Sequence, residues 1–145
     1  MWIVIIIIVV IILWFILSYT VDTKITKLKK KADHIFEKKY GRKIEYNVYE
    51  TKDYSRTINK NIYLVLKDVD GYYYDDDTLL SVLIHELTHV ECPRYKKDID
   101  KGEKYHSEEF YEVENDLIEI GKDLNYFKKY DTEGVKTDDR YPCRE

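Results

Sequence analysis

The chain has 145 residues, with 24 Lys and Arg against 28 Asp and Glu, giving a formal net charge of −4. This length leaves room for one domain with one modest core, and two cysteines exclude a disulfide scaffold. The charge is unevenly divided, because residues 22–67 hold 13 basic against 6 acidic residues (+7) and residues 68–145 hold 11 against 22 (−11). The acidic second half disfavours nucleic acid as a partner.

Residues 1–21 carry no charge and are mostly Ile, Val, Leu, Trp and Phe, so we expect a transmembrane signal-anchor. About 20 helical residues span the roughly 30 Å of a bilayer's hydrocarbon core. A cleaved signal peptide is the alternative, but no basic residue precedes Lys24 and Ser18–Thr20 is a poor cleavage site. Because lysines follow the apolar run, the positive-inside rule predicts a single-pass membrane protein whose remaining domain faces the cytoplasm.

The segment after the apolar run has apolar residues at helical spacing, and Gly41 is expected to end that helix. Residues 44–48 and 62–67 then alternate between apolar and polar side chains, which is typical of strands. Two further helical patterns follow. The order predicts an α+β domain over residues 22–130 with a small antiparallel or mixed sheet, and a polar tail over residues 131–145.

The helical stretch Thr78–Val90 contains the pattern H-E-x-x-H as His85-Glu86-Leu87-Thr88-His89. Histidines four residues apart lie one turn above each other, so their imidazoles converge on one point. They supply two of the three protein ligands of a catalytic zinc, whose fourth position is left for water. Glu86 is next to the first histidine and close enough to take a proton from that water. The pattern therefore indicates zinc-dependent hydrolysis of an amide bond.

His106 is the expected third ligand, because it directly precedes the second amphipathic helix and would be held on a packed element. A His₂Glu site would instead take its carboxylate from that helix, where Glu109 and Glu112 are candidates. Cys92, one turn past His89, could also approach the metal, although a buried free thiol is the simpler interpretation. An oxyanion-stabilising tyrosine stays open among three candidates, Tyr95, Tyr105 and Tyr130.

Four stretches, Asn59–Lys67, Asp70–Gly71, Leu79–Val90 and His106–Phe110, together resemble the WLM metallopeptidases, relatives of the SprT/Spartan proteases. The likeness is closest to WLM-like proteins of large DNA viruses and covers roughly Lys27 to Phe127. It implies a minimal zincin fold, Zn²⁺ held by His85, His89 and His106, and Glu86 as general base. By analogy with zincins, the strand Ile62–Lys67 would hold substrate as an added strand.

The expected function is that of a membrane-anchored zinc metalloendopeptidase acting on a protein or peptide substrate, with no nucleic acid partner. One alternative is a membrane-tethered binding or assembly protein whose fold zinc stabilises; such a protein would have no use for Glu86. The other is a protease of DNA–protein crosslinks, against which the anchor and the acidic second half both count.

Overall fold

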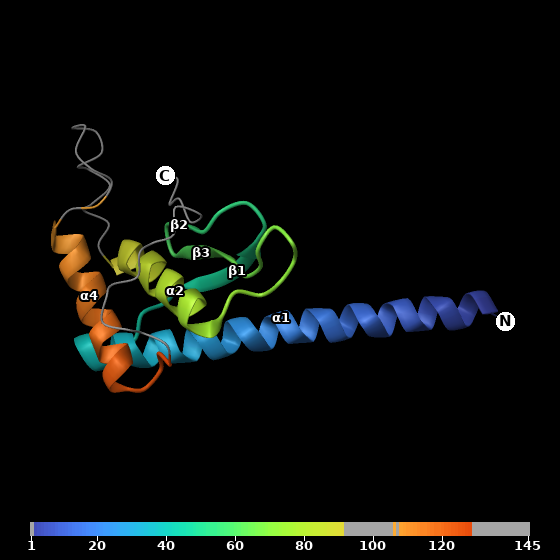
Figure 1. Cartoon of the computed structure of the whole chain (residues 1–145), viewed down its shortest axis with the longest axis horizontal. Helices are drawn as coiled ribbons and strands as arrows, with labels where there is room; N and C mark the ends of the chain where they lie inside the picture. The colour runs from blue at the N-terminus through green and yellow to red at the C-terminus, as the bar shows by residue number, and fades with distance from the viewer. Residues whose placement is uncertain (1, 92–105, 107, 129–145) are drawn as a thin grey trace.

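The computed structural model describes residues 2–91, 106 and 108–128, with side chains except for residues 2–5 and 18–23. Three helices and one sheet make up this part of the chain (Figure 1). Their bounds are α1 (Trp2–Tyr40), β1 (Asn47–Thr51), β2 (Arg56–Ile58), β3 (Asn61–Val65), α2 (Asp76–Glu91) and α4 (Glu108–Asp123). This part of the chain is a small α+β domain, as predicted, but its sheet has a third strand, β2, which lies in the chain between the two that were expected.

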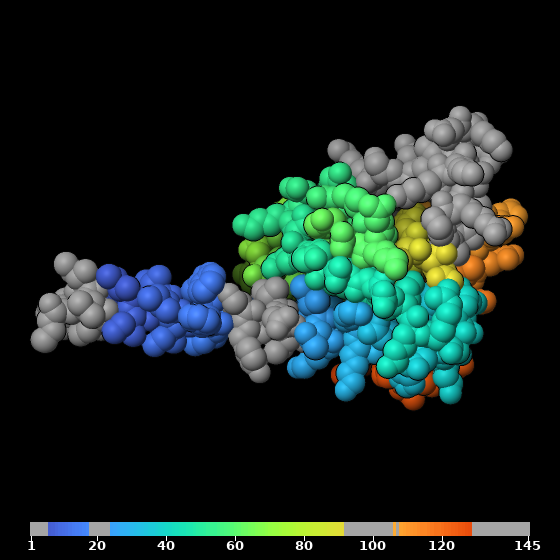
Figure 2. Space-filling view, turned by 180° about the vertical axis from the view of Figure 1, so that it is seen from behind, coloured from blue at the N-terminus to red at the C-terminus, as the bar shows by residue number. Residues whose placement is uncertain are grey.

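Helix α1 has two halves with different surroundings. Its first half projects away from the other elements (Figures 1 and 2), and the large apolar side chains of residues 6–17 are 48–63% exposed. The second half packs against α2 and α4, burying Leu28, Ala32, Ile35 and Phe36. The helix ends as predicted at Gly41, whose φ of +65° suits a residue without a side chain and whose N–H donates to the carbonyl of Glu37.

The expected membrane anchor over residues 1–21 is wrong. Within the described residues, none of the helices combines the length and the apolar character that crossing a bilayer requires. The single-pass topology, and the cytoplasmic orientation that was inferred from it, are therefore wrong as well.

The sheet has the strand order β1-β3-β2, with β1 parallel and β2 antiparallel to β3. Ile62 and Leu64 of β3 are fully buried against the helices. The prediction that Ile62–Lys67 receives substrate as an added strand is wrong, because β3 already pairs with a strand on each side. The outer positions belong to β1 and to β2, a three-residue strand that the alternation of side chains did not predict.

The apolar faces of α2 and α4 close the core over the sheet and α1. Asp75 caps α2, because its Oδ1 accepts a hydrogen bond of 3.0 Å from the Thr78 N–H. In α4, Phe110, Leu117 and Gly121 are buried. Gly121 lets α4 approach closely, since a Cβ there would lie 2.5 Å from the ring of Phe127 and 3.0 Å from Ile35. These contacts fix α2, which carries His85 and His89, and α4, which begins just after His106.

Candidate metal centre

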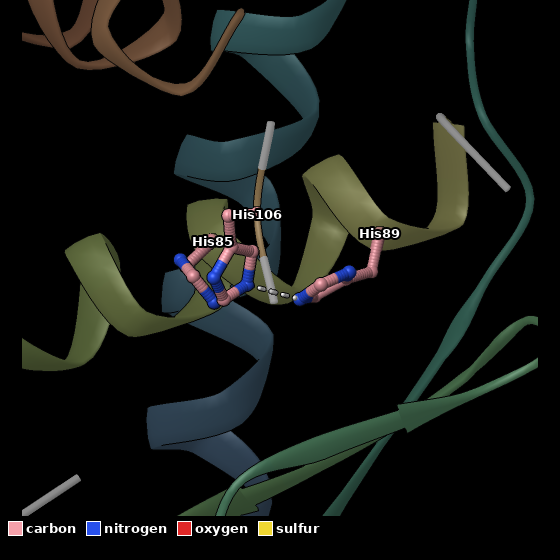
Figure 3. A group of neighbouring side chains, drawn as sticks. All are labelled: His85, His89 and His106. Atoms are coloured by element: carbon pink, nitrogen blue, oxygen red, sulfur yellow. Dashed lines mark hydrogen bonds between the residues drawn. The ribbon is translucent and has the colours of Figure 1, made fainter. Parts of the chain in front are cut away.

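His85 and His89 lie on the same face of α2 and point toward His106 (Figure 3). Their ring centroids are 5.0 Å apart, as the four-residue spacing predicts. The opposite face of α2 is anchored in the core by Leu80, Leu83 and Leu87. Buried leucines on one side thus keep both imidazoles on the other.

His106 meets this pair from its position just before α4. Its ring centroid is 4.8 Å from that of His85 and 5.0 Å from that of His89. The ring of Phe110, one turn into α4 and fully buried, packs 4.4 Å from the His106 ring. One nitrogen from each histidine can be chosen so that all three lie within 4.8 Å of one another. The three histidines could therefore hold a metal ion.

Two of the nitrogens are close enough to share one metal ion. Nε2 of His106 lies 3.1 Å from Nε2 of His89 (dashed in Figure 3). Two ligands at the usual Zn–N distance of about 2.0–2.1 Å and a tetrahedral angle are about 3.3 Å apart. Two imidazole acceptors at this separation repel unless a proton or a cation lies between them, so the donor set fits such an ion.

The electrostatics favour the form of His106 that binds a metal. Burial lowers the pKa of His106 to about 4; the positive charge of a protonated His85 acts in the same direction, and Glu114 opposes both. Only a neutral imidazole has a nitrogen lone pair free for a metal. His106 is therefore in its ligand form throughout the neutral pH range.

Glu114 of α4 is a residue that the sequence reasoning missed. Its Oε1 lies 2.8 Å from Nδ1 of His85, and both side chains are only 13% exposed. A signal was available, because Glu114 is four residues after Phe110 and therefore on the same face of α4. The two glutamates considered as ligands, Glu109 and Glu112, are exposed. Within residues 2–91, 106 and 108–128, the three histidines form the one group arranged for a metal.

Glu86 lies on α2 beside His85 but is turned into the protein, with 1% of its surface exposed. Thr57 of β2 donates to it through Oγ1, at 2.7 Å from Oε2 of the carboxylate and 2.9 Å from the main-chain carbonyl. The predicted base is thus held at the junction of α2 with the outer strand of the sheet.

Neither family models, nor curated proteins, nor solved structures match this chain. The expected kinship with proteins of large DNA viruses has no support from these comparisons, and the description as a viral membrane protein is corrected accordingly. The functional evidence therefore comes from the site itself. Three histidines could hold a metal ion, the Glu114 carboxylate contacts His85, and the buried Glu86 follows His85 in the chain.

Four sequence-based candidates lie outside the described residues. They are the possible ligand Cys92 and the three possible oxyanion-stabilising tyrosines, Tyr95, Tyr105 and Tyr130. The polar tail over residues 131–145 lies outside them as well. His34, the fourth histidine, is on α1 with its Nδ1 2.6 Å from the Tyr126 hydroxyl, and does not belong to the cluster.

Proposed function

We propose that this protein is a zinc-dependent metallopeptidase of the WLM type that hydrolyses peptide bonds in a protein or peptide substrate. The observation that carries the proposal is the convergence of His85, His89 and His106, with the buried carboxylate of Glu86 next to them in the chain. Three histidine ligands leave one tetrahedral position open, which is the arrangement of catalytic rather than structural zinc sites.

Each residue has a defined task in this reaction. His85, His89 and His106 would hold the ion through neutral nitrogens, and Glu114 would keep His85 in the correct tautomer. Held by these residues, zinc would supply activation of water, whose pKa it lowers to about 7, and polarisation of the scissile carbonyl. Glu86 would accept the proton of the attacking water and donate it to the amine that leaves.

The outer edge of β2 is the place for the substrate main chain. β2 ends the strand order and contacts α2 (Figure 1). A strand at the end of a sheet offers N–H and C=O groups that an extended peptide can pair with. Since Thr57 of β2 touches Glu86, a peptide paired with β2 would lie close to the base. The substrate strand is thus β2 instead of the predicted Ile62–Lys67.

Glu86→Gln tests the proposal in the zinc-loaded full chain. The amide is nearly isosteric and can still accept the hydrogen bond of Thr57, so the fold and the zinc should be retained. Cleavage of an unfolded protein substrate should fall by about 10²–10⁴, the usual contribution of a positioned base. The matched control is Glu91→Gln on the same helix, where the glutamate pairs with Arg42. Cleavage by Glu86→Gln at the wild-type rate would contradict the role of Glu86 as the base. Absence of cleavage by the zinc-loaded wild type would contradict the peptidase proposal and leave a zinc-stabilised binding protein.

A further inference from the structure

Thr57 is the point at which the sheet touches the proposed catalytic base. It lies in the middle of β2, where it pairs with Ile62 of β3, and its hydroxyl reaches across to α2. The hydroxyl is 2.7 Å from Oε2 of Glu86 and 2.9 Å from the carbonyl oxygen of the same residue. Both distances are those of good O–H···O hydrogen bonds.

Both acceptors of the Thr57 hydroxyl, the carbonyl oxygen and Oε2, belong to Glu86. One hydroxyl hydrogen serves two oxygens of a single residue, so the Thr57 oxygen is located relative to the backbone of α2 as well as to the carboxylate. The charged carboxylate is the stronger acceptor. The hydroxyl therefore restrains the Glu86 side chain against its own helix through Oε2.

The support behind Thr57 is rigid. Its partner across the ladder, Ile62, is fully buried. The Val65 N–H donates to the Ser55 hydroxyl at 3.0 Å, which fastens the chain just before β2 to the far end of β3. Threonine is branched at Cβ and so has few side-chain rotamers. A group held in this way can fix a neighbour to the precision that proton transfer needs.

We propose that Thr57 is a positioning residue, whose hydroxyl fixes the orientation of the Glu86 carboxylate for proton transfer. This inference rests on the proposed function, because it assigns Glu86 as the base. A merely structural link between β2 and α2 would change stability when it is lost, whereas a positioning role changes the turnover of folded, zinc-loaded enzyme. The kinetic readout separates the two roles.

The test compares Thr57→Val, which removes the hydroxyl at nearly constant shape, with Thr57→Ser, which keeps it. We expect Thr57→Val to bind zinc as the wild type does, to lower kcat by about 10- to 100-fold and to leave KM within about twofold. Thr57→Ser should restore most of kcat. Thr51→Val makes the same change at the end of β1, the other outer strand.

Crystal structures of the zinc-loaded wild type and of both variants provide a readout that does not need activity. In the wild type and in Thr57→Ser, Glu86 should have one side-chain conformation, and in Thr57→Val it should have several. If the zinc-loaded wild type cleaves nothing, the proposed function fails while the order of Glu86 in Thr57→Val still decides its positioning. An unchanged kcat in Thr57→Val, or an unchanged single conformation of Glu86, would overturn the role of Thr57.

Discussion

Nδ1 of His85 lies 2.8 Å from Oε1 of Glu114, so a carboxylate of α4 holds an imidazole of α2. The contact places the ring proton on Nδ1 and turns the lone pair of Nε2 outward. Histidines that bind metals usually donate their second N–H to such a partner, which fixes the tautomer and makes the ligand nitrogen more basic. The two helices are therefore coupled through the site as well as through the core.

Loss of this carboxylate should weaken the metal without removing it. We expect Glu114→Gln to bind one zinc per chain with an affinity about 10- to 100-fold lower than the wild type. Competition with a chromogenic chelator of known affinity measures the change. Glu119→Gln is the control on the same helix, since Glu119 pairs with Lys122 at the surface. An affinity equal to that of the wild type would assign Glu114 a purely structural part.

The ligand set predicts a definite pattern of zinc contents. Elemental analysis should give one zinc per wild-type chain, none after His85→Ala or His89→Ala, and weakened binding after His106→Ala, because each change removes one of three nitrogens. His34→Ala should keep the full content, since that ring lies on α1, outside the cluster, and hydrogen-bonds the Tyr126 hydroxyl. Full zinc in His106→Ala together with loss in Glu109→Ala or Glu112→Ala would move the third ligand to the glutamates.

The close approach at Gly121 makes a stability prediction that is independent of catalysis. In Gly121→Ala the new Cβ would lie 2.5 Å from the Phe127 ring, so Phe127 or α4 must shift. Overpacking of this kind costs about 1–3 kcal/mol. Urea unfolding of the zinc-free protein measures it, and Glu119→Ala, an exposed change on the same helix, should stay within about 0.5 kcal/mol. An unfolding free energy of Gly121→Ala equal to that of the wild type would show that Phe127 and α4 can shift without loss of stability.

Tyr46 predicts how stability changes in alkali. The side chain is 5% exposed, and its hydroxyl has no hydrogen-bond partner among the described residues, although the Asp33 carboxylate is near enough to act through its charge. Burial, and then that negative charge, raise the pKa of Tyr46 far above its ordinary value of about 10. The folded state thus holds the proton more tightly. The stability that Tyr46 contributes is complete below about pH 10 and is lost as the unfolded chain releases the proton above it.

Tyr46→Phe should therefore be at least as stable as the wild type at pH 7, because it removes an unsatisfied hydroxyl. Above pH 10 its advantage should grow. Urea unfolding of both proteins at pH 7 and at about pH 11 measures the difference. Tyr72→Phe, at a side chain that is 74% exposed, should show no such growth. A constant difference between Tyr46→Phe and wild type across this range would contradict a raised pKa.

Local spacing predicted the helical parts of the fold well. The expected helix Thr78–Val90 falls inside α2, and the two histidines four residues apart face the same way because the period of a helix leaves no alternative. The end of α1 at Gly41 followed from the same local reasoning. His106 also joined the pair, since the helix that it precedes has the apolar face needed to pack beside α2.

The sheet and the contacts of the site were beyond local reasoning. β2 is too short for a pattern of alternation, and only pairing with β3, which a turn through Asn59 allows, makes it a strand. The carboxylate of Glu114 and the hydroxyl of Thr57 each meet α2 from 29 residues away in the chain. Such contacts depend on how whole elements pack.

The proximity of His89 and His106 also affects how the protein would unfold. A metal ion bound to both would cross-link α2 to α4 and close the chain between these two positions. Closing a loop of about 15 residues in this way removes about 3 kcal/mol of conformational freedom from the unfolded chain. Removal of the ion would loosen α4 before the rest of the core. A chelator would then act on this protein as a local denaturant as well as an inhibitor.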